Sequence, residues 1–352
     1  MFARSGMLGI DLFSGAGGLS LGATWAGIDI KCAIEFDYEA AETYKKNHED
    51  CVMLNTDIRN VYSKDLKINH PFILFGGAPC QGYSLSNQKT RTIDNPKNSL
   101  YKEFIRLVTE LNPEWVLFEN VQGIVSFNAG QVVSDIKTDF EKLGYKVKKK
   151  IMNACQYGVP QIRNRFILVA NRLNFDFSFP EPSNRIVTVA DAIMDLPILS
   201  NGESKEKEKY RNYTSDYIQK MRVGANFATQ NYVSTNKKYV IERYKHIKQG
   251  ENWKAIPCNL MKNYANLNNC HSGIYYRLKE NEPSIIISNY RKNMLIHPTQ
   301  NRGLSVREAA RLQSFPDTFE FCGTLNKIQQ QIGNAVPPLL AKAVFQRIMQ
   351  YE

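Results

Sequence analysis

Cys80 is the residue whose type and setting most directly allow covalent chemistry. It lies in the segment Phe75-Gly76-Gly77-Ala78-Pro79-Cys80-Gln81, where a short apolar run gives way to glycine, proline and a single thiol. The run at residues 72–75 is typical of a buried strand, which the glycines and Pro79 end. A cysteine delivered at the end of a central strand can face a ligand and act as a nucleophile. The alternative is a buried free cysteine that only fills space.

An acid and two arginines can serve the same site. Glu119 follows the apolar run at residues 115–118, so we expect it at another strand end. Partial burial near the thiol would raise its proton affinity and let it donate to a ring nitrogen. Arg163 and Arg165 alternate ahead of residues 166–170, so they share one face and can orient Glu119 or contact phosphate and carbonyl oxygens. A solvated carboxylate and outward-facing arginines are the alternatives.

A glycine-rich turn at residues 13–18 predicts a ligand site. Glycine permits positive φ and close backbone approach, so the turn can hold a ligand against exposed N–H groups and a helix N-terminus. Ser20 stands where the third glycine of G-x-G-x-x-G belongs, which disfavours a nicotinamide or flavin cofactor. Glu35, 20 residues beyond Gly15, and Asp57 suit a ribose and an adenine amino group. Either acid alone could be a surface residue, but with the turn they favour a nucleoside-containing cofactor.

The elements that position these residues alternate between strands and helices. Strands are expected at residues 8–13, 30–35, 72–75, 115–119 and 166–170, with helices at 16–26, 38–47, 100–111 and 132–143. This βαβ pattern predicts an α/β fold with a mostly parallel sheet, helices on both faces and ligands at the carboxyl ends of the strands. A helical pattern returns at Ser305, and residues 338–349 predict a final amphipathic helix.

Length and composition predict a globular chain of two domains, or of one domain that carries a large insertion. The 352 residues are 43% hydrophobic, which allows a sizeable core. No apolar run approaches the roughly 18 residues of a membrane helix, and residues 1–10 are too short for a signal peptide, so we expect a cytoplasmic chain. Seven scattered cysteines without a C-x-x-C pair, and five dispersed histidines, predict neither a disulfide framework nor a metal site.

A basic, tyrosine-rich segment follows the proline-containing stretch at residues 179–183, where the composition changes. Residues 201–300 hold 17 Lys and Arg against 8 Asp and Glu, and ten of the 18 tyrosines. This mixture suits phosphate contact, base-edge hydrogen bonds and stacking. It favours nucleic-acid binding over the alternative of a solvated surface.

In combination these motifs resemble the DNA (cytosine-5)-methyltransferases of prokaryotic restriction-modification systems. The matching blocks occur in the family's order, at residues 11–18, 79–81, 119–121, 161–165, 302–317 and 331–337. Ala78 replaces the first proline of the commoner Pro-Pro-Cys-Gln, and Lys97 stands where arginine is frequent; neither change removes a reacting group. The resemblance implies a Rossmann-like, S-adenosylmethionine-dependent methyltransferase sheet at residues 1–185 and 325–352. A smaller target-recognition domain with a hinge would occupy residues 186–324.

The resemblance also implies a reaction. A methyl group passes from S-adenosylmethionine to C5 of a flipped-out cytosine in a specific double-stranded DNA sequence, through a covalent bond between Cys80 and C6. Glu119, Arg163 and Arg165 complete the implied catalytic set, residues 81–99 form a lid, and the base that removes the C5 proton is not identified. The implied cofactor-binding residues are Phe13, Gly15, Ala16, Gly18, Glu35, Phe36, Asp57, Ile58, Gly77, Pro79, Leu100 and Asn334.

Two alternatives stay open: a tRNA cytosine-5 methyltransferase, and a catalytically idle DNA-binding relative. A basic insertion of roughly a hundred residues favours duplex readout, and the intact Cys80, Glu119, Arg163 and Arg165 favour activity. We expect a monomer without a membrane partner, with any cognate restriction endonuclease acting separately. The recognition sequence cannot be predicted, because the insertion offers many polar side chains and no register.

Overall fold

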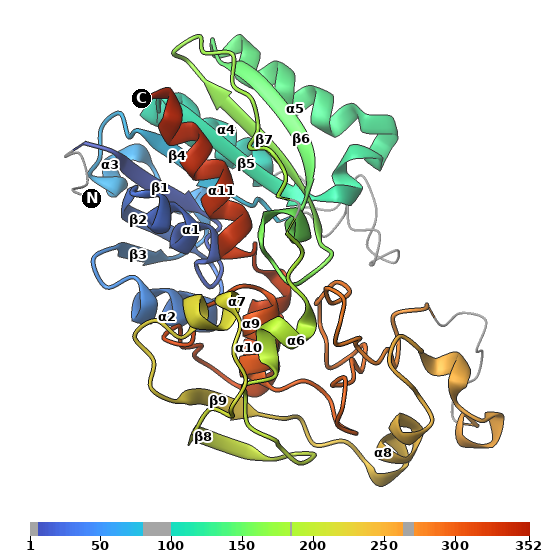
Figure 1. Ribbon diagram of the computed structural model, residues 1–352. Coiled ribbons are helices and arrows are strands. Elements are labelled where there is room, and N and C mark those ends of the chain that lie inside the picture. The colour runs from blue at the N-terminus through green and yellow to red at the C-terminus, as the bar shows by residue number, and fades with distance from the viewer. Residues whose placement is uncertain (1–5, 80–99, 184, 263–270) are drawn as a thin grey trace. The chain divides into compact units, whose positions relative to one another are not determined.

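The computed structural model describes residues 6–79, 100–183, 185–262 and 271–352. The chain forms two compact units (Figure 1). Unit 1 comprises Met1–Ala154, Asn164–Pro182 and Pro338–Glu352, and unit 2 comprises Cys155–Arg163 and Ser183–Pro337.

The two units differ from the predicted domains in two segments. Residues 155–163 and 325–337 were expected in the catalytic domain, but both belong to unit 2. Hydrogen bonds explain the first difference, since Gln161 donates to the carbonyl oxygen of Leu312 at 3.1 Å and accepts from the N–H of Ile287 at 2.9 Å. Close packing explains the second, since a Cβ added to Gly333 would lie 2.2 Å from the carbonyl oxygen of Ser288.

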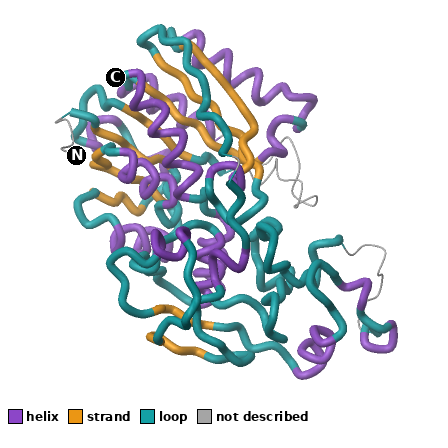
Figure 2. The backbone as a smooth tube through the Cα atoms, viewed as in Figure 1, coloured by secondary structure: helices purple, strands orange, loops and turns teal. Residues whose placement is uncertain are grey.

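A seven-stranded sheet forms the centre of unit 1, with the strand order β3-β2-β1-β4-β5-β7-β6. Figure 2 draws the strands in orange. Strands β1 to β5 are parallel, β7 is antiparallel to β5, and β6 is antiparallel to β7. This arrangement confirms the predicted α/β class and the mostly parallel sheet. The strands are β1 (Leu8–Leu12), β2 (Asp29–Glu35), β3 (Val52–Asn55), β4 (Ile73–Gly76), β5 (Trp115–Val121), β6 (Lys146–Asn153) and β7 (Asn164–Asn171).

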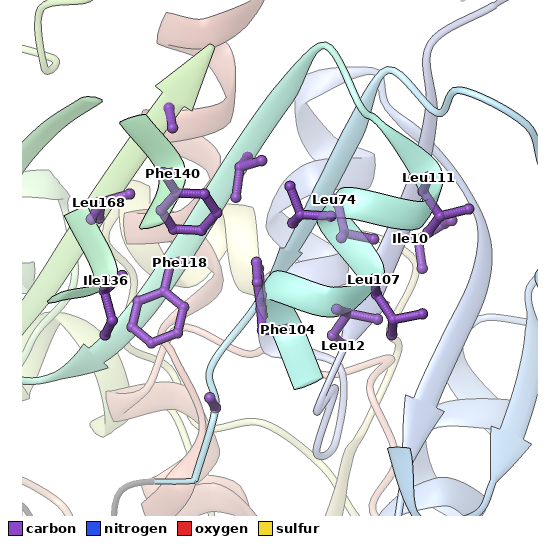
Figure 3. Close-up of a cluster of buried hydrophobic side chains, with 14 of the residues drawn as sticks. Ile10, Leu12, Leu74, Phe104, Leu107, Leu111, Phe118, Ile136, Phe140 and Leu168 are labelled. Atoms are coloured by element: carbon purple, nitrogen blue, oxygen red, sulfur yellow. The ribbon is translucent and has the colours of Figure 1, made fainter. Parts of the chain in front are cut away.

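Helices cover both faces of this sheet. Figure 3 shows Phe104 of α4 and Phe140 of α5 among apolar strand residues of one face, including Phe118 and Leu168. On the opposite face Phe75 of β4 meets Phe345 of α11, with ring centroids 5.0 Å apart. The helices of unit 1 are α1 (Gly18–Ala26), α2 (Tyr38–Asn47), α3 (Ser63–Leu66), α4 (Leu100–Leu111), α5 (Gln131–Lys142) and α11 (Pro338–Ile348).

Helices α1 and α11 pack unusually closely, although they come from opposite ends of the chain (Figure 1). A Cβ added to Gly22 would lie 2.5 Å from the Cβ of Ala341 and 2.6 Å from the carbonyl oxygen of Pro338. Only glycine allows this backbone approach. The final helix therefore supports the helix that follows the glycine turn.

The edge strand β6 was not expected from the sequence. Four of its eight residues are lysines, among them Lys149 and Lys150, which are exposed. Lysines on an edge strand hinder pairing with other chains, so the strand lacks the apolar pattern by which strands are recognised. β3 was also not delimited, since its residues are only partly buried or exposed.

Unit 2 has little regular structure, and polar side chains hold its loops together. Arg277 is buried and donates to the carbonyl oxygens of Ile247, His297 and Tyr244 at 2.6 to 2.8 Å. Arg243 is also buried and donates to the carbonyl oxygen of Leu260. The elements of unit 2 are α6 (Val189–Ile193), β8 (Ser204–Glu208), α7 (Asp216–Met221), β9 (Ala228–Tyr232), α8 (Lys238–Lys245), α9 (Val306–Leu312) and α10 (Leu325–Asn334). Across the described ranges, none of the helices is long and apolar enough to cross a bilayer.

Candidate active site

The side chain of Glu119 lies in a buried ion pair at the carboxyl end of β5. Its Oε1 is 2.8 Å from Nε of Arg165, and the two side chains are 10% and 6% exposed. Arg165 lies beside this strand end because β7 runs antiparallel to β5 and Arg165 pairs with Val121. Burial lowers the pKa of Arg165, and the charge of Glu119 opposes that effect. The structure thus brings together two of the residues predicted to be catalytic.

Gly77 provides the space for this carboxyl group. A Cβ added at Gly77 would lie 2.5 Å from Oε2 of Glu119, which is closer than real Cβ atoms approach. Gly77 directly follows β4, the parallel neighbour of β5, because Gly76 pairs with Phe118 in the register. Cys80 comes three residues after Gly77 in sequence and lies outside the described residues, as do Lys97 and the expected lid at residues 81–99.

Asn120 connects the same strand end to the segment that leads to the thiol. Its side-chain nitrogen donates to the carbonyl oxygen of Ala78 at 3.3 Å, and its side-chain oxygen accepts from the N–H of Val121 at 2.8 Å. Asn120 belongs to the block at residues 119–121, in which only Glu119 was given a role. Asn120 holds the backbone just before Pro79.

Arg163 has a different environment from Arg165. It is 1% exposed and belongs to unit 2. Its guanidinium donates to the carbonyl oxygens of Ile287 at 2.7 Å, Gly333 at 2.7 Å and Ala335 at 3.1 Å. The two arginines were expected to share one face, but each is bound within its own unit. The catalytic role expected for Arg163 stays a prediction.

The glycine turn follows β1 and has an unusual backbone. Phe13, Gly15 and Gly17 have φ values of 60°, 55° and 93°, in the left-handed region. The N–H of Ser14 donates to Ile34, and that of Gly17 donates to Ser14, both at 3.0 Å. These donors were expected to face a ligand, but they are used within unit 1. A Cβ added to Gly15 meets nothing within 4 Å, so the turn offers open space instead.

Glu35 fixes the turn from the end of β2. Its Oε2 accepts from the N–H of Gly15 at 2.8 Å, and its Oε1 accepts from the N–H of Asp37 at 2.7 Å. Burial raises the pKa of Glu35, and these backbone hydrogen bonds oppose the shift. Each carboxylate oxygen has a further lone pair, so Glu35 can also accept from ribose hydroxyls.

Asp57 and Phe36 lie near the ends of the neighbouring strands. Arg59 donates to Asp57 through Nε at 2.9 Å and through a terminal nitrogen at 2.5 Å. This hydrogen bonding lowers the pKa of Asp57. The adjacent Ile58 is buried, whereas Phe36 is 74% exposed. An exposed aromatic ring next to Glu35 can stack on a flat base.

The other predicted cofactor residues lie at the starts or ends of elements. Ala16 and Gly18 flank the beginning of α1, Pro79 is half-buried after β4, and Leu100 begins α4. Asn334 ends α10 in unit 2, is exposed, and accepts from Gln330 at 2.6 Å. Their roles stay predictions.

Tyr44 and His48, which lie behind the turn, were not predicted from the sequence. Ser20 was noted in the sequence, but not as a polar contact. Ser20 donates to Oδ2 of Asp11 at 2.7 Å. The missing third glycine was used only to exclude other cofactors, yet a serine at that position signals a polar contact beneath the turn.

The site combines a glycine turn after β1 with an acid at the end of β2. Both lie on a mostly parallel sheet whose strand β7 is antiparallel, and this combination defines a class of protein. This is the fold of an S-adenosylmethionine-dependent methyltransferase, as predicted. Comparison with known proteins identifies the family. The family model for C-5 cytosine-specific DNA methylases matches residues 7–350. The chain therefore belongs to the C-5 cytosine-specific DNA methylase family and is an enzyme of that class.

Full-length relatives support this assignment. The chain is 36% identical to the Type II methyltransferase M1.HphI of Haemophilus parahaemolyticus, over 97% of this chain and 86% of the relative. It is 35% identical to M.DdeI of Desulfomicrobium norvegicum, over 97% and 88%. A crystal structure of an E. coli protein described as a prophage-encoded DNA modification methyltransferase matches with TM-score 0.81 and 28% identity, covering 98% and 99% of the two chains. Dnmt2 methyltransferase of S. pombe, at TM-score 0.59 and 16% identity, shares the fold.

The family and fold imply S-adenosylmethionine as methyl donor, and the residues of the turn fit it. The space above Gly15 and the exposed ring of Phe36 suit a ligand with a flat base. Oδ1 of Asp11 and the hydroxyl of Ser14 are buried and have no hydrogen-bond partner in the described part of the chain. Polar atoms of this kind beside the turn suit the amino-acid end of the cofactor.

The cysteines and acids of the described ranges do not form a metal site. No group of three or more His, Cys, Asp or Glu side chains there is arranged to bind a metal ion. The five cysteines within those ranges are free thiols.

Proposed function

We propose that this enzyme methylates C5 of a cytosine within a specific sequence of double-stranded DNA, through a covalent bond between Cys80 and C6. The proposal deepens the family assignment, which gives cytosine-C5 methylation of DNA without the reacting residues.

The buried Glu119–Arg165 pair is the observation that carries this proposal. It lies beside Gly77, three residues before Cys80, at the carboxyl edge of a sheet where α/β proteins bind ligands. Burying an ion pair costs desolvation that packed apolar residues would avoid, which supports a functional role for this pair. A carboxyl group at this place can hydrogen-bond the N3 edge of a cytosine whose C6 faces the thiol.

The reaction follows from the electronic properties of cytosine. C5 is a poor nucleophile while the ring is aromatic. Addition of the Cys80 thiolate to C6 breaks the C5–C6 double bond and brings negative charge into the ring. Glu119 stabilises that charge at N3, so that C5 gains enamine character. Bound S-adenosylmethionine supplies the methyl group that C5 accepts. Loss of the C5 proton and departure of the thiolate then restore the ring.

C6 is inaccessible in a stacked duplex, so the target nucleotide must leave the helix. Within this proposal Glu119 acts on the extruded base. Arg165 orients Glu119. Arg163 supports the segment by satisfying backbone carbonyl groups of unit 2.

Unit 2 supplies the DNA contacts in this proposal. Its buried Arg243 and Arg277 are used by the fold, so they contribute little to a binding surface. Exposed lysines on and around α8 are better suited to phosphate contact. They include Lys237, Lys238, Lys248 and Lys254.

A methyl-transfer assay tests the proposal. Labelled S-adenosylmethionine is supplied with duplex DNA, single-stranded DNA or tRNA, and bisulfite sequencing of a plasmid from expressing cells locates the modified base. We expect transfer to duplex DNA at cytosines of one short sequence. Transfer to tRNA alone would support the RNA alternative, and no transfer to any substrate would support the idle relative. We expect a monomer in this assay, with any cognate restriction endonuclease acting separately.

A further inference from the structure

A chain of buried hydrogen bonds runs behind the glycine turn. The hydroxyl of Ser20 donates to Oδ2 of Asp11 at 2.7 Å and lies 2.7 Å from the hydroxyl of Tyr44. All three residues are 0% exposed. Asp11 is the last but one residue of β1, Ser20 lies in the first turn of α1, and Tyr44 belongs to α2. The chain therefore ties together the strand and the two helices around the turn.

His48 continues this structure onto the turn itself. Its ring lies on the ring of Tyr44, with centroids 4.3 Å apart, and hydrogen-bonds to the backbone of Gly17. A Cβ added to Gly17 would lie 2.5 Å from Nε2 of His48. The imidazole is therefore in contact with the backbone of the turn. Burial lowers the pKa of His48 to about 4, so the ring is neutral at physiological pH.

The turn requires such support because of its backbone conformation. Phe13 is not glycine but has φ 60°, a conformation that costs roughly 1–2 kcal/mol. Glu35 holds the other side of the turn through the N–H of Gly15. Apolar side chains behind the turn would cost less desolvation, whereas a buried network of hydrogen bonds favours one geometry of the turn over its neighbours.

We propose that Ser20, Tyr44 and His48 are positioning residues that fix the turn at residues 13–17 in the shape that receives the cofactor. None of the three needs to touch the cofactor, since they act through the backbone of the turn. This inference rests on the proposed use of the turn for S-adenosylmethionine.

Binding of S-adenosylhomocysteine, measured by calorimetry on the full chain, tests the proposal. Tyr44→Phe removes only the hydroxyl, and Ser20→Ala removes the central link. We expect the Kd of S-adenosylhomocysteine and the KM of S-adenosylmethionine to rise about tenfold in each variant, the equivalent of one buried hydrogen bond. We expect kcat at saturating cofactor to stay within about twofold, because the hydrogen bonds position the turn without entering the chemistry. Ser20→Thr keeps the hydroxyl and should restore most of the affinity.

Tyr145→Phe is the matched control. Tyr145 is also buried in unit 1 and donates to the carbonyl oxygen of Pro113 at 2.6 Å, away from the turn. The control should lose stability but keep its affinity for S-adenosylhomocysteine. An unchanged Kd in Tyr44→Phe and Ser20→Ala, with a loss of stability like that of the control, overturns the inference. If the unmodified chain bound no S-adenosylhomocysteine, the proposed cofactor site itself would be wrong.

Discussion

Oε1 of Glu119 and Nε of Arg165 lie 2.8 Å apart in a part of unit 1 where both side chains are almost fully buried. The pair is formed by two antiparallel neighbours, β5 and β7, so the sheet itself sets its geometry. Oε2 of Glu119 lies against Gly77, which leads toward Cys80. The position of this carboxyl group therefore depends on three strands and on the absence of a side chain at one glycine.

Arg165→Ala should damage both folding and chemistry. Removal of one partner leaves the Glu119 charge buried without its arginine, which typically costs about 3–5 kcal/mol. Urea denaturation measures that loss. Trapping on duplex DNA containing 5-fluorocytosine should slow by at least tenfold, because Glu119 would no longer be held in position at N3 of the base. Arg172→Ala, at an exposed site of unit 1, is the control and should leave both quantities unchanged.

Gly77→Ala tests whether the carboxyl group needs its present position. The added Cβ would push Oε2 of Glu119 away from a 2.5 Å approach. We expect the single-turnover methylation rate to fall by roughly 10²-fold, because a displacement of about 1 Å can have that effect. Gly303→Ala, where the nearest atom is 3.7 Å away, should retain the rate. Equal rates for Gly77→Ala and the unmodified enzyme would refute the positional requirement.

Gly22→Val tests the packing of the final helix on α1. The larger side chain would collide with Pro338 and Ala341, and overpacking of this kind costs about 1–3 kcal/mol. The free energy of unfolding should decrease by that amount. Thr24→Val, at an exposed position of the same helix, keeps a β-branched residue and should leave the free energy of unfolding nearly unchanged. Full stability in Gly22→Val would mean that α11 can move away from α1 without cost.

His48 should make stability depend on pH. Its pKa is about 4 in the folded chain, because of burial, against about 6.5 when unfolded. As the pH falls, the unfolded chain therefore binds this proton before the folded chain does. The contribution of His48 to the free energy of unfolding is full above about pH 6.5 and declines by up to about 3 kcal/mol as the pH falls toward 4. Burial raises the pKa of Tyr44 and, to about 11, that of Cys51, so neither titrates in this window.

His48→Gln provides the comparison for this pH dependence. Asp11 is present in both chains, so its own titration cancels in the difference. The unmodified chain should lose more stability than His48→Gln between pH 6.5 and 4 in parallel urea titrations. Parallel curves would show that protonation of His48 does not carry the effect.

Sequence patterns predicted the elements that carry the site, since their apolar periodicity is strong. The helices expected at residues 38–47 and 100–111 have those bounds in the structure. β6 was not predicted because this exposed edge strand is rich in lysine and lacks an apolar pattern. Strand-end positions also placed Glu119 and Glu35 correctly at the carboxyl edge, because parallel strands end together.

Partner choice within the site could not be predicted from spacing alone. Alternation gave Arg163 and Arg165 the same face, but hydrogen-bonding groups distant in sequence decide where each guanidinium binds. The use of the turn's N–H groups by Ile34, Glu35 and Ser14 likewise depends on tertiary contacts. The excess of basic residues did not separate the buried arginines of unit 2 from its exposed lysines.

The identity of the nucleophile is the central claim, and mass spectrometry of a trapped complex tests it most directly. The enzyme is incubated with S-adenosylmethionine and a duplex whose target cytosine is replaced by 5-fluorocytosine, then digested and analysed. We predict one cross-linked peptide with the nucleotide attached to Cys80, and no complex from Cys80→Ala, which should still bind S-adenosylhomocysteine. A cross-link at another residue, or 5-methylcytosine formation by Cys80→Ala, would contradict the mechanism.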